Sequence, residues 1–369
     1  MLLSDLTASA TRLALVGLAK NTGKTEALAT LLRELRACGR AVGVTSVGRD
    51  GEEHDVIDAR IAKPAVLLWG GSLVATTDAL LRASGLPHDL LEQTDVRTPL
   101  GRVLIARLRG AGAIEIAGPS GAAQVRSVAD TMLAHGAEQI LIDGAIDRRA
   151  ASSPNVADGL VMSTGAVLSE DIEEVVAQTR EAVELVRLSP LTAEPEHEAR
   201  LRSLVAADGG AALLIGEQGD PALLPPRFAL NASARELGAL LDEHPDARWL
   251  ILAGALPDRF LRELVTATRQ RRGGGAGRGE GGGGGWGLTV VVSDATHVFL
   301  AEKSLDWYRR QGIVLAVARP IELLALTVNP VAPESHSFDS RELCARLRAA
   351  IADVPIYDVR DPDYFALAK

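Results

Sequence analysis

The chain has 369 residues, 47% of them hydrophobic and 24% charged, which is enough for a large core and for two domains or one extended α/β domain. Its formal charge of −9 argues against a nucleic-acid partner, because phosphate contacts need clustered Lys and Arg. Cys38 and Cys344 are too isolated for a disulfide framework. The start lacks the basic segment of a signal peptide, and no run of about 18 apolar residues predicts a membrane span. We expect a cytoplasmic globular protein with no membrane partner.

Short aliphatic runs alternate with helix-period stretches through the first half, a pattern typical of βαβ units that form a mostly parallel, doubly wound sheet. The predicted strands are residues 12–16, 41–47, 65–69, 113–117, 139–142 and 159–163. The predicted helices are residues 24–37, 75–83, 100–109, 124–135 and 171–188. These elements define a first α/β domain over residues 1–190.

A polar connection at residues 194–198 predicts the domain boundary, and residues 191–369 are expected to form a second, smaller α/β unit. Its predicted strands are residues 211–215, 249–253, 288–292, 313–317 and 323–328, and its predicted helices are residues 232–242, 257–269, 304–311 and 340–351. Residues 273–287 are nearly all Gly, so ordering them would cost more chain entropy than it recovers. We expect a disordered loop there.

The run Gly-Leu-Ala-Lys-Asn-Thr-Gly-Lys-Thr at residues 17–25 stands between a predicted strand and a predicted helix, which is the context of a phosphate-binding loop (P-loop). Five residues separate Gly17 from Gly23, one more than in the common motif. Backbone amides of such a loop and the positive end of the next helix surround a triphosphate. The alternative is a chance Gly-Lys-Thr at a turn. The predicted nucleotide-binding residues are Gly17, Lys20, Asn21, Thr22, Gly23, Lys24, Thr25 and Glu26.

The expected ligands are ATP and Mg²⁺, with Lys24 on the β- and γ-phosphates and the Thr25 hydroxyl on the metal. A P-loop enzyme also needs an acid at the end of a neighbouring strand, and Asp143 follows the strand predicted at residues 139–142. Lys24 and Asp143 are therefore the predicted catalytic residues. The alternative for Asp143 is a cap on the next turn.

Two further groups of charged residues follow predicted strands. Asp50 and Glu52 come after residues 41–47 and are predicted to complete the Mg²⁺ site with Thr25 and Asp143, with Arg49 near the phosphates. A solvated acidic turn is the alternative. Asp147 and Arg148 either face the γ-phosphate or a substrate, or are surface charges.

Several phrases together resemble a known family: residues 16–25, Thr-Ser-Val-Gly-Arg-Asp-Gly-Glu at 45–52, Thr-Pro-Leu-Gly at 98–101, Ala-Gly-Pro-Ser at 117–120 and Ile-Asp-Gly-Ala at 142–145. The longer loop is similar to that of dethiobiotin synthetase and the cobyrinate amide-forming enzymes, in the P-loop class that also contains the MinD-type ATPases. The signature Lys of those ATPases is absent, because Ala19 takes its place. Over residues 12–168 the chain most resembles the small P-loop subunit of the reactivase that accompanies lysine 5,6-aminomutase.

This resemblance implies an ATPase that works with a second, MutS-like subunit to release damaged cobalamin from a B12-dependent aminomutase. It carries over Lys24, Thr25 and Asp143 by motif, and it allows a homodimer. Two alternatives stay open. One is an ATP-dependent ligase related to dethiobiotin synthetase or the cobyrinate amidases, and the other is a non-catalytic nucleotide sensor.

Overall fold

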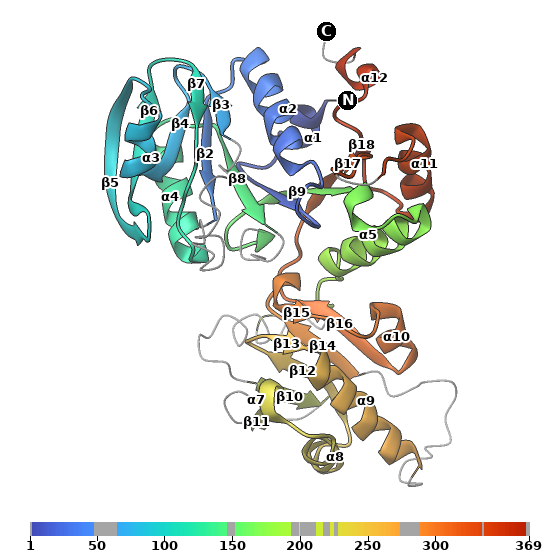
Figure 1. The fold of residues 1–369 in the computed structure, drawn as a ribbon. Helices are drawn as coiled ribbons and strands as arrows, with labels where there is room; N and C mark the ends of the chain where they lie inside the picture. The colour runs from blue at the N-terminus through green and yellow to red at the C-terminus, as the bar shows by residue number, and fades with distance from the viewer. Residues whose placement is uncertain are drawn as a thin grey trace. The chain divides into compact units, whose positions relative to one another are not determined.

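The chain forms two compact units in a computed structural model that describes residues 2–47, 65–145, 152–192, 199, 212–216, 222–224, 228–273, 288–333 and 336–366. Unit 1 combines Met1–Val183 with Ile321–Lys369, and unit 2 is the insertion Glu184–Pro320. The sequence predicted a single cut at residue 190. The difference lies in residues 321–369, which were assigned to the second domain and instead complete unit 1 (Figure 1).

Unit 1 is built on a nine-stranded sheet in the order β18-β17-β9-β1-β8-β2-β4-β6-β5. The strands from β18 to β4 run parallel, and β6 and β5 are antiparallel additions at one edge. The α/β class with a large, mostly parallel sheet is therefore confirmed. The strands are β1 (Arg12–Gly17), β2 (Val42–Ser46), β4 (Leu73–Thr77), β5 (His88–Thr98), β6 (Gly101–Leu108), β8 (Gln139–Ala145), β9 (Gly159–Gly165), β17 (Leu323–Asn329) and β18 (Ile356–Tyr357).

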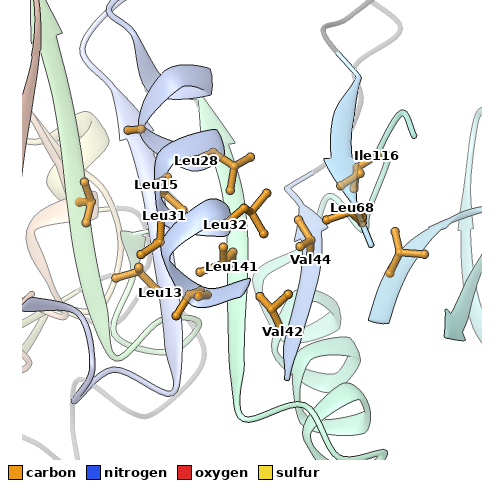
Figure 2. Close-up of a cluster of buried hydrophobic side chains, with 14 of the residues drawn as sticks. Leu13, Leu15, Leu28, Leu31, Leu32, Val42, Val44, Leu68, Ile116 and Leu141 are labelled. Atoms are coloured by element: carbon orange, nitrogen blue, oxygen red, sulfur yellow. The ribbon is translucent and has the colours of Figure 1, made fainter. Parts of the chain in front are cut away.

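Helices of unit 1 pack on both faces of this sheet. They are α1 (Leu3–Leu6), α2 (Lys24–Ala37), α3 (Asp78–Ala83), α4 (Ala122–Ala134), α5 (Ile172–Val186), α11 (Ser340–Ala350) and α12 (Pro362–Ala366). Successive strand side chains point to opposite faces. Leu13 and Leu141 face α2, as Figure 2 shows, whereas Gly43 faces α4, where an added Cβ would come within 2.7 Å of Met132 Cε. A larger residue at position 43 would require the ends of the Ile140 and Met132 side chains to shift.

Of the two helices predicted between residues 75 and 109, the first starts too early and the second is wrong. Residues 75–77 belong to strand β4, so the helix is confined to α3, and residues 100–109 form strand β6 instead of a helix. Pairing decides the outcome: β6 is hydrogen-bonded to β4 on one side and to β5 on the other. Gly101, with φ of 123°, lies at the hairpin turn and adopts a backbone conformation that other residues avoid.

The strand predicted at residues 113–117 is shorter and lies outside the main sheet. Strand β7 (Gly112–Ile114) pairs antiparallel with β3 (Val66–Leu68) in a separate two-stranded sheet. The predicted strand at residues 323–328 is present as β17, but it pairs with β9 of unit 1. An open edge of the parallel sheet is thereby covered by the last part of the chain, which explains the return to unit 1.

Unit 2 has its own mixed sheet of five strands in the order β11-β10-β12-β14-β16. Strands β12, β14 and β16 are parallel to one another. Strand β10 pairs antiparallel with β12 on one side and with β11 on the other. The strands of unit 2 are β10 (Ala212–Gly216), β11 (Ala222–Leu224), β12 (Ala247–Leu252), β13 (Leu256–Pro257), β14 (Leu288–Val292), β15 (Val298–Phe299) and β16 (Ile313–Val317). Its helices are α7 (Phe228–Asn231), α8 (Ala234–Glu243), α9 (Asp258–Gly273) and α10 (Leu305–Arg310).

Residues 274–287, most of the Gly-rich stretch, lie outside the described residues, so the expectation of disorder stays a prediction. Among the described helices, none combines the length and the apolar composition that crossing a membrane requires.

A buried hydrogen-bond network connects both ends of the chain to helix α2. The Tyr364 hydroxyl on α12 donates to Glu34 Oε1 at 2.6 Å and accepts from the Leu3 amide at 2.8 Å. Glu34 is 5% exposed, and its second oxygen accepts from the Ser4 amide at 2.8 Å. Burial and the neighbouring Glu34 raise the pKa of Tyr364, so the phenol stays protonated as a donor. These hydrogen bonds therefore hold α1 and α12 against α2.

We expect Tyr364→Phe to lower the free energy of unfolding of unit 1 by about 1–3 kcal/mol, because it leaves the buried Glu34 carboxylate and the Leu3 amide each short of a partner. Urea denaturation followed by circular dichroism measures the change. Tyr357→Phe is the matched control, since its ring contacts Tyr364 but its hydroxyl is not part of the network. Equal stability of the two variants would contradict the role assigned to the hydroxyl.

Candidate functional site

The loop of residues 18–23 joins the end of β1 to the start of α2 at the carboxyl edge of the parallel sheet. The Leu18 amide donates to Ser163 O of β9 at 2.8 Å, which holds the start of the loop against the sheet. Asn21 and Gly23 then take left-handed backbone conformations, with φ of 65° and 85°. Gly23 tolerates this geometry because it has no Cβ, and Asn is the next most tolerant residue. The chain thus turns sharply into the helix.

The interior of the loop is filled by Thr22, which is 1% exposed. Its hydroxyl donates to Ala19 O at 3.0 Å. A Cβ added to Gly17 would lie 2.5 Å from Thr22 Oγ1, so a larger residue at the end of β1 would push the loop open. The loop can therefore close only with a residue as small as Gly at position 17, and Thr22 stabilises it from the inside through its bond to Ala19 O.

The outside of the loop is supported by Asn329, the last residue of β17. Its Nδ2 donates to Asn21 O at 2.8 Å, and its Oδ1 accepts from the Val331 amide at 3.2 Å. A Cβ on Gly23 would come within 3.0 Å of Asn329 Cβ, so the two backbones are in close contact. The residue from the end of the chain thus fixes the carbonyl of the left-handed Asn21.

Lys24, the first residue of α2, forms an ion pair with Asp143 on β8. The two side chains are 22% and 31% exposed, so solvent and solutes reach the pair. Asp143 shares its face of the sheet with Leu141, two residues earlier, which is the face that α2 covers. A pair with this exposure contributes about 0–1 kcal/mol. A ligand with negative charge can therefore take over the Lys24 ammonium at little cost.

Hydroxyl groups from neighbouring strands complete the same edge. Ser46 ends β2 beside Asp143, accepts from the Gly118 amide at 3.0 Å and donates to Ile116 O at 3.2 Å. Ser163 of β9 and Thr327 of β17 share a hydrogen bond of 2.7 Å. A Cβ on Gly118 would lie 2.0 Å from Ser46 O, so the segment after β7 packs against the end of β2. The edge is closely packed beneath the loop.

The start of α2 supplies backbone donors without acceptors of its own. The first amides of a helix have no intrahelical partner, and Gly23 at the N-cap has no side chain to accept from them. Together with the positive end of the helix dipole and the Lys24 ammonium, they make a place suited to an anion. The missing Cβ atoms of Gly17 and Gly23 leave room for Thr22 Oγ1 and Asn329 Cβ, which pack there and set the shape of the loop.

Some of the predicted nucleotide-binding and catalytic residues lie together in the structure, and others fall outside the described residues. Lys24 and Asp143 are in direct contact, and Gly17 and Gly23 frame the loop. The side chains of Lys20, Asn21, Thr25 and Glu26 are exposed around it. The remaining candidates lie outside the described residues: Arg49, Asp50, Glu52, Asp147 and Arg148.

Sequence reasoning missed Asn329. A signal was present, because Asn329-Pro330 follows an apolar run directly, and a polar residue at the end of a parallel strand belongs at the carboxyl edge. Assigning residues 323–328 to a second domain concealed it.

Comparisons of this chain with protein-family models, with curated proteins and with solved structures give no match.

We expect Asn329→Ala to speed amide hydrogen exchange at residues 21–23 about 10-fold, because one hydrogen bond of roughly 1–1.5 kcal/mol is lost there. Asn329→Asp keeps an acceptor for Val331 but loses the donor, so it should show the same increase. Exchange measured by mass spectrometry on the whole chain reports both, with helix α4 as the internal reference. Unchanged exchange at residues 21–23 would show that the bond does not hold the loop.

Proposed function

We propose that unit 1 is a P-loop ATPase that binds ATP with Mg²⁺ at residues 17–25. The observation that carries the proposal is the Lys24–Asp143 ion pair, which places a cation from the helix start against an acid from the adjacent parallel strand. The start of α2 agrees with the requirement of a polyphosphate for helix amides that no side chain caps and for a positive helix potential.

Each residue has a chemical task in this proposal. The loop amides and Lys24 hold the β- and γ-phosphates, so that the ammonium leaves Asp143 when ATP arrives. Asp143 then becomes available for the water shell of the metal or for orienting the attacking water, and Thr25 offers its hydroxyl to the metal. Bound Mg²⁺ supplies charge neutralisation on the phosphate oxygens. Asn329 and Thr22 keep the loop in shape before the nucleotide binds.

The partner belongs to the same proposal. The phrases shared with the reactivase subunit support a chaperone-like role, in which ATP binding and hydrolysis switch a conformation that acts on a B12-dependent aminomutase together with a MutS-like subunit. This part rests on the sequence phrases. The ATPase part rests on the site geometry, so the two are tested separately.

The competing functions fit the site less well. An amidase needs a glutaminase thiol, but Cys344 is buried in α11 and burial raises the pKa of its thiol. A pure sensor has no need of an acid beside the loop lysine, whereas Asp143 contacts Lys24 directly. A ligase of the dethiobiotin synthetase kind shares the ATP site and differs in requiring a small carboxylate co-substrate.

We expect the purified chain to hydrolyse ATP slowly in the presence of Mg²⁺, and Lys24→Ala to reduce the rate about 100-fold or more, because a donor to the transition-state phosphate is lost. Phosphate release measures the rate. Arg36→Ala is the matched control, since it removes one positive charge at the other end of α2 and should keep the wild-type rate. If Lys24→Ala and Arg36→Ala have the same activity, the site is not at this loop.

Asp143→Asn distinguishes catalysis from sensing. We expect it to bind ATP within a few-fold of wild type, because the phosphates are held by the loop, but to lose most Mg²⁺-dependent turnover. Calorimetric titration with a non-hydrolysable ATP analogue gives the affinity. Turnover that appears only with an added carboxylate would support the ligase, and binding without any turnover in the wild type would support the sensor. Stimulation of the wild-type rate by a B12-dependent aminomutase would support the partner.

A further inference from the structure

Unit 2 has a surface cavity of about 540 Å³ between α9 and α10. Its volume falls within the range of small-molecule sites, roughly 300–1,000 Å³. All but one of its lining residues come from α9, and Trp307 of α10 supplies the other side. We call it the α9 cavity, and its lining residues are Arg259, Arg262, Glu263, Val265, Thr266, Arg269 and Trp307.

The arginines of the α9 cavity lie along one face of the helix. Arg259, Arg262 and Arg269 follow one another at intervals of three and seven residues, which returns each side chain to nearly the same side. Ten residues of helix separate the first from the last by about 15 Å along the axis. The lining therefore has Arg259 and Arg269 at its two ends, with Arg262 about one helical turn from Arg259.

Two of these three positive charges have no anionic partner among the described residues. Arg262 is neutralised, with Nε 3.0 Å from Asp258 Oδ2 and Nη1 2.9 Å from Glu302 Oε2. Arg269 donates only to the neutral Gln311 Oε1, at 3.2 and 2.5 Å. Arg259 makes no ion pair or hydrogen bond within the part of unit 2 that is described. The charges at the two ends are thus available to a ligand.

Two cations lie over the ring of Trp307, and a buried hydrogen bond fixes the helix that carries this ring. The Arg269 guanidinium and the Lys303 ammonium lie 5.8 and 5.6 Å from the centre of the Trp307 ring. The next residue, Tyr308, donates from its buried hydroxyl to Asp258 Oδ1 at 2.7 Å, which ties α10 to the start of α9. The cavity is therefore preformed, so little ordering entropy is lost when a ligand binds.

The lining contains one acid, Glu263, whose Oε2 accepts from the Ala234 amide at the start of α8 at 2.8 Å. Its single negative charge is outnumbered by Arg259, Arg269 and the nearby Lys303. Guanidinium groups match phosphoryl oxygens in geometry and hold them with two hydrogen bonds each. A nucleic-acid site would need a longer run of cations, and among the described side chains around the cavity only Arg259, Arg269 and Lys303 have no anionic partner.

We propose that the α9 cavity binds a small organic ligand with phosphoryl groups at two separated points, one held by Arg259 and the other by Arg269 with Lys303. The site is on unit 2 and does not depend on the loop at residues 17–25. It therefore adds a second phosphate site to the chain, whether or not unit 1 hydrolyses ATP.

The test uses the full chain with Lys24→Ala, so that the loop of unit 1 does not contribute, and inorganic tripolyphosphate as the probe in calorimetric titration. We expect one binding event per chain, and we expect Arg259→Gln with Arg269→Gln to weaken it about 10-fold or more. Arg309→Gln with Arg310→Gln removes the same charge from α10 outside the cavity and should change the affinity less than 3-fold.

Three results would overturn the proposal: no binding of tripolyphosphate, equal weakening by both double variants, or a single-stranded oligoribonucleotide that binds more tightly than tripolyphosphate with the same arginine dependence. If Lys24→Ala fails to fold, the same titrations in the wild-type background decide, because the double variant then removes one of two binding events. Orthophosphate should bind more weakly than tripolyphosphate, since it carries less negative charge and offers fewer oxygens to the guanidinium groups.

Discussion

The packing of α2 on the parallel sheet is the constraint on which the candidate site depends. Leu28, Leu31 and Leu32 are buried against Leu13 and Leu141, and Figure 2 shows this contact from the side of the helix. Each such side chain contributes about 1.5–3 kcal/mol, whereas a solvent-accessible ion pair such as the half-buried Lys24–Asp143 pair contributes about 1 kcal/mol. Apolar burial therefore fixes α2 against the sheet. It holds Lys24, at the start of the helix, within reach of Asp143 on β8.

The sequence was sufficient for those parts of the site that are local. Residues 12–37 contain the strand, the glycines and the amphipathic helix in unbroken order, so the β1–loop–α2 arrangement follows from periodicity and turn chemistry. Asp143 lies 119 residues from Lys24, yet it was found because acids at the carboxyl ends of neighbouring parallel strands converge on one edge. The fold class follows in the same way from alternation of strands and helices.

The errors arose where pairing between distant segments overrides local pattern. Residues 101–108 contain apolar residues at helical as well as strand spacing, and only the neighbours β4 and β5 make them a strand. Strand β17 reads as part of the second domain because it follows that domain in sequence. Asn329 contacts Asn21 over a separation of 308 residues, and no periodicity within either segment encodes such a contact.

The insertion of unit 2 into unit 1 determines how the two proposed phosphate sites can influence each other. Closing a longer loop costs only about 0.6 kcal/mol for each doubling of its length, so the presence of unit 2 hardly weakens the pairing of β17 with β9. Strand β17 begins immediately after unit 2, and its other end holds the loop through Asn329. A ligand in the α9 cavity affects ATP binding only if it stabilises a conformation that moves this strand. Because coupling is reciprocal, ATP would then alter the affinity of the α9 cavity by the same factor.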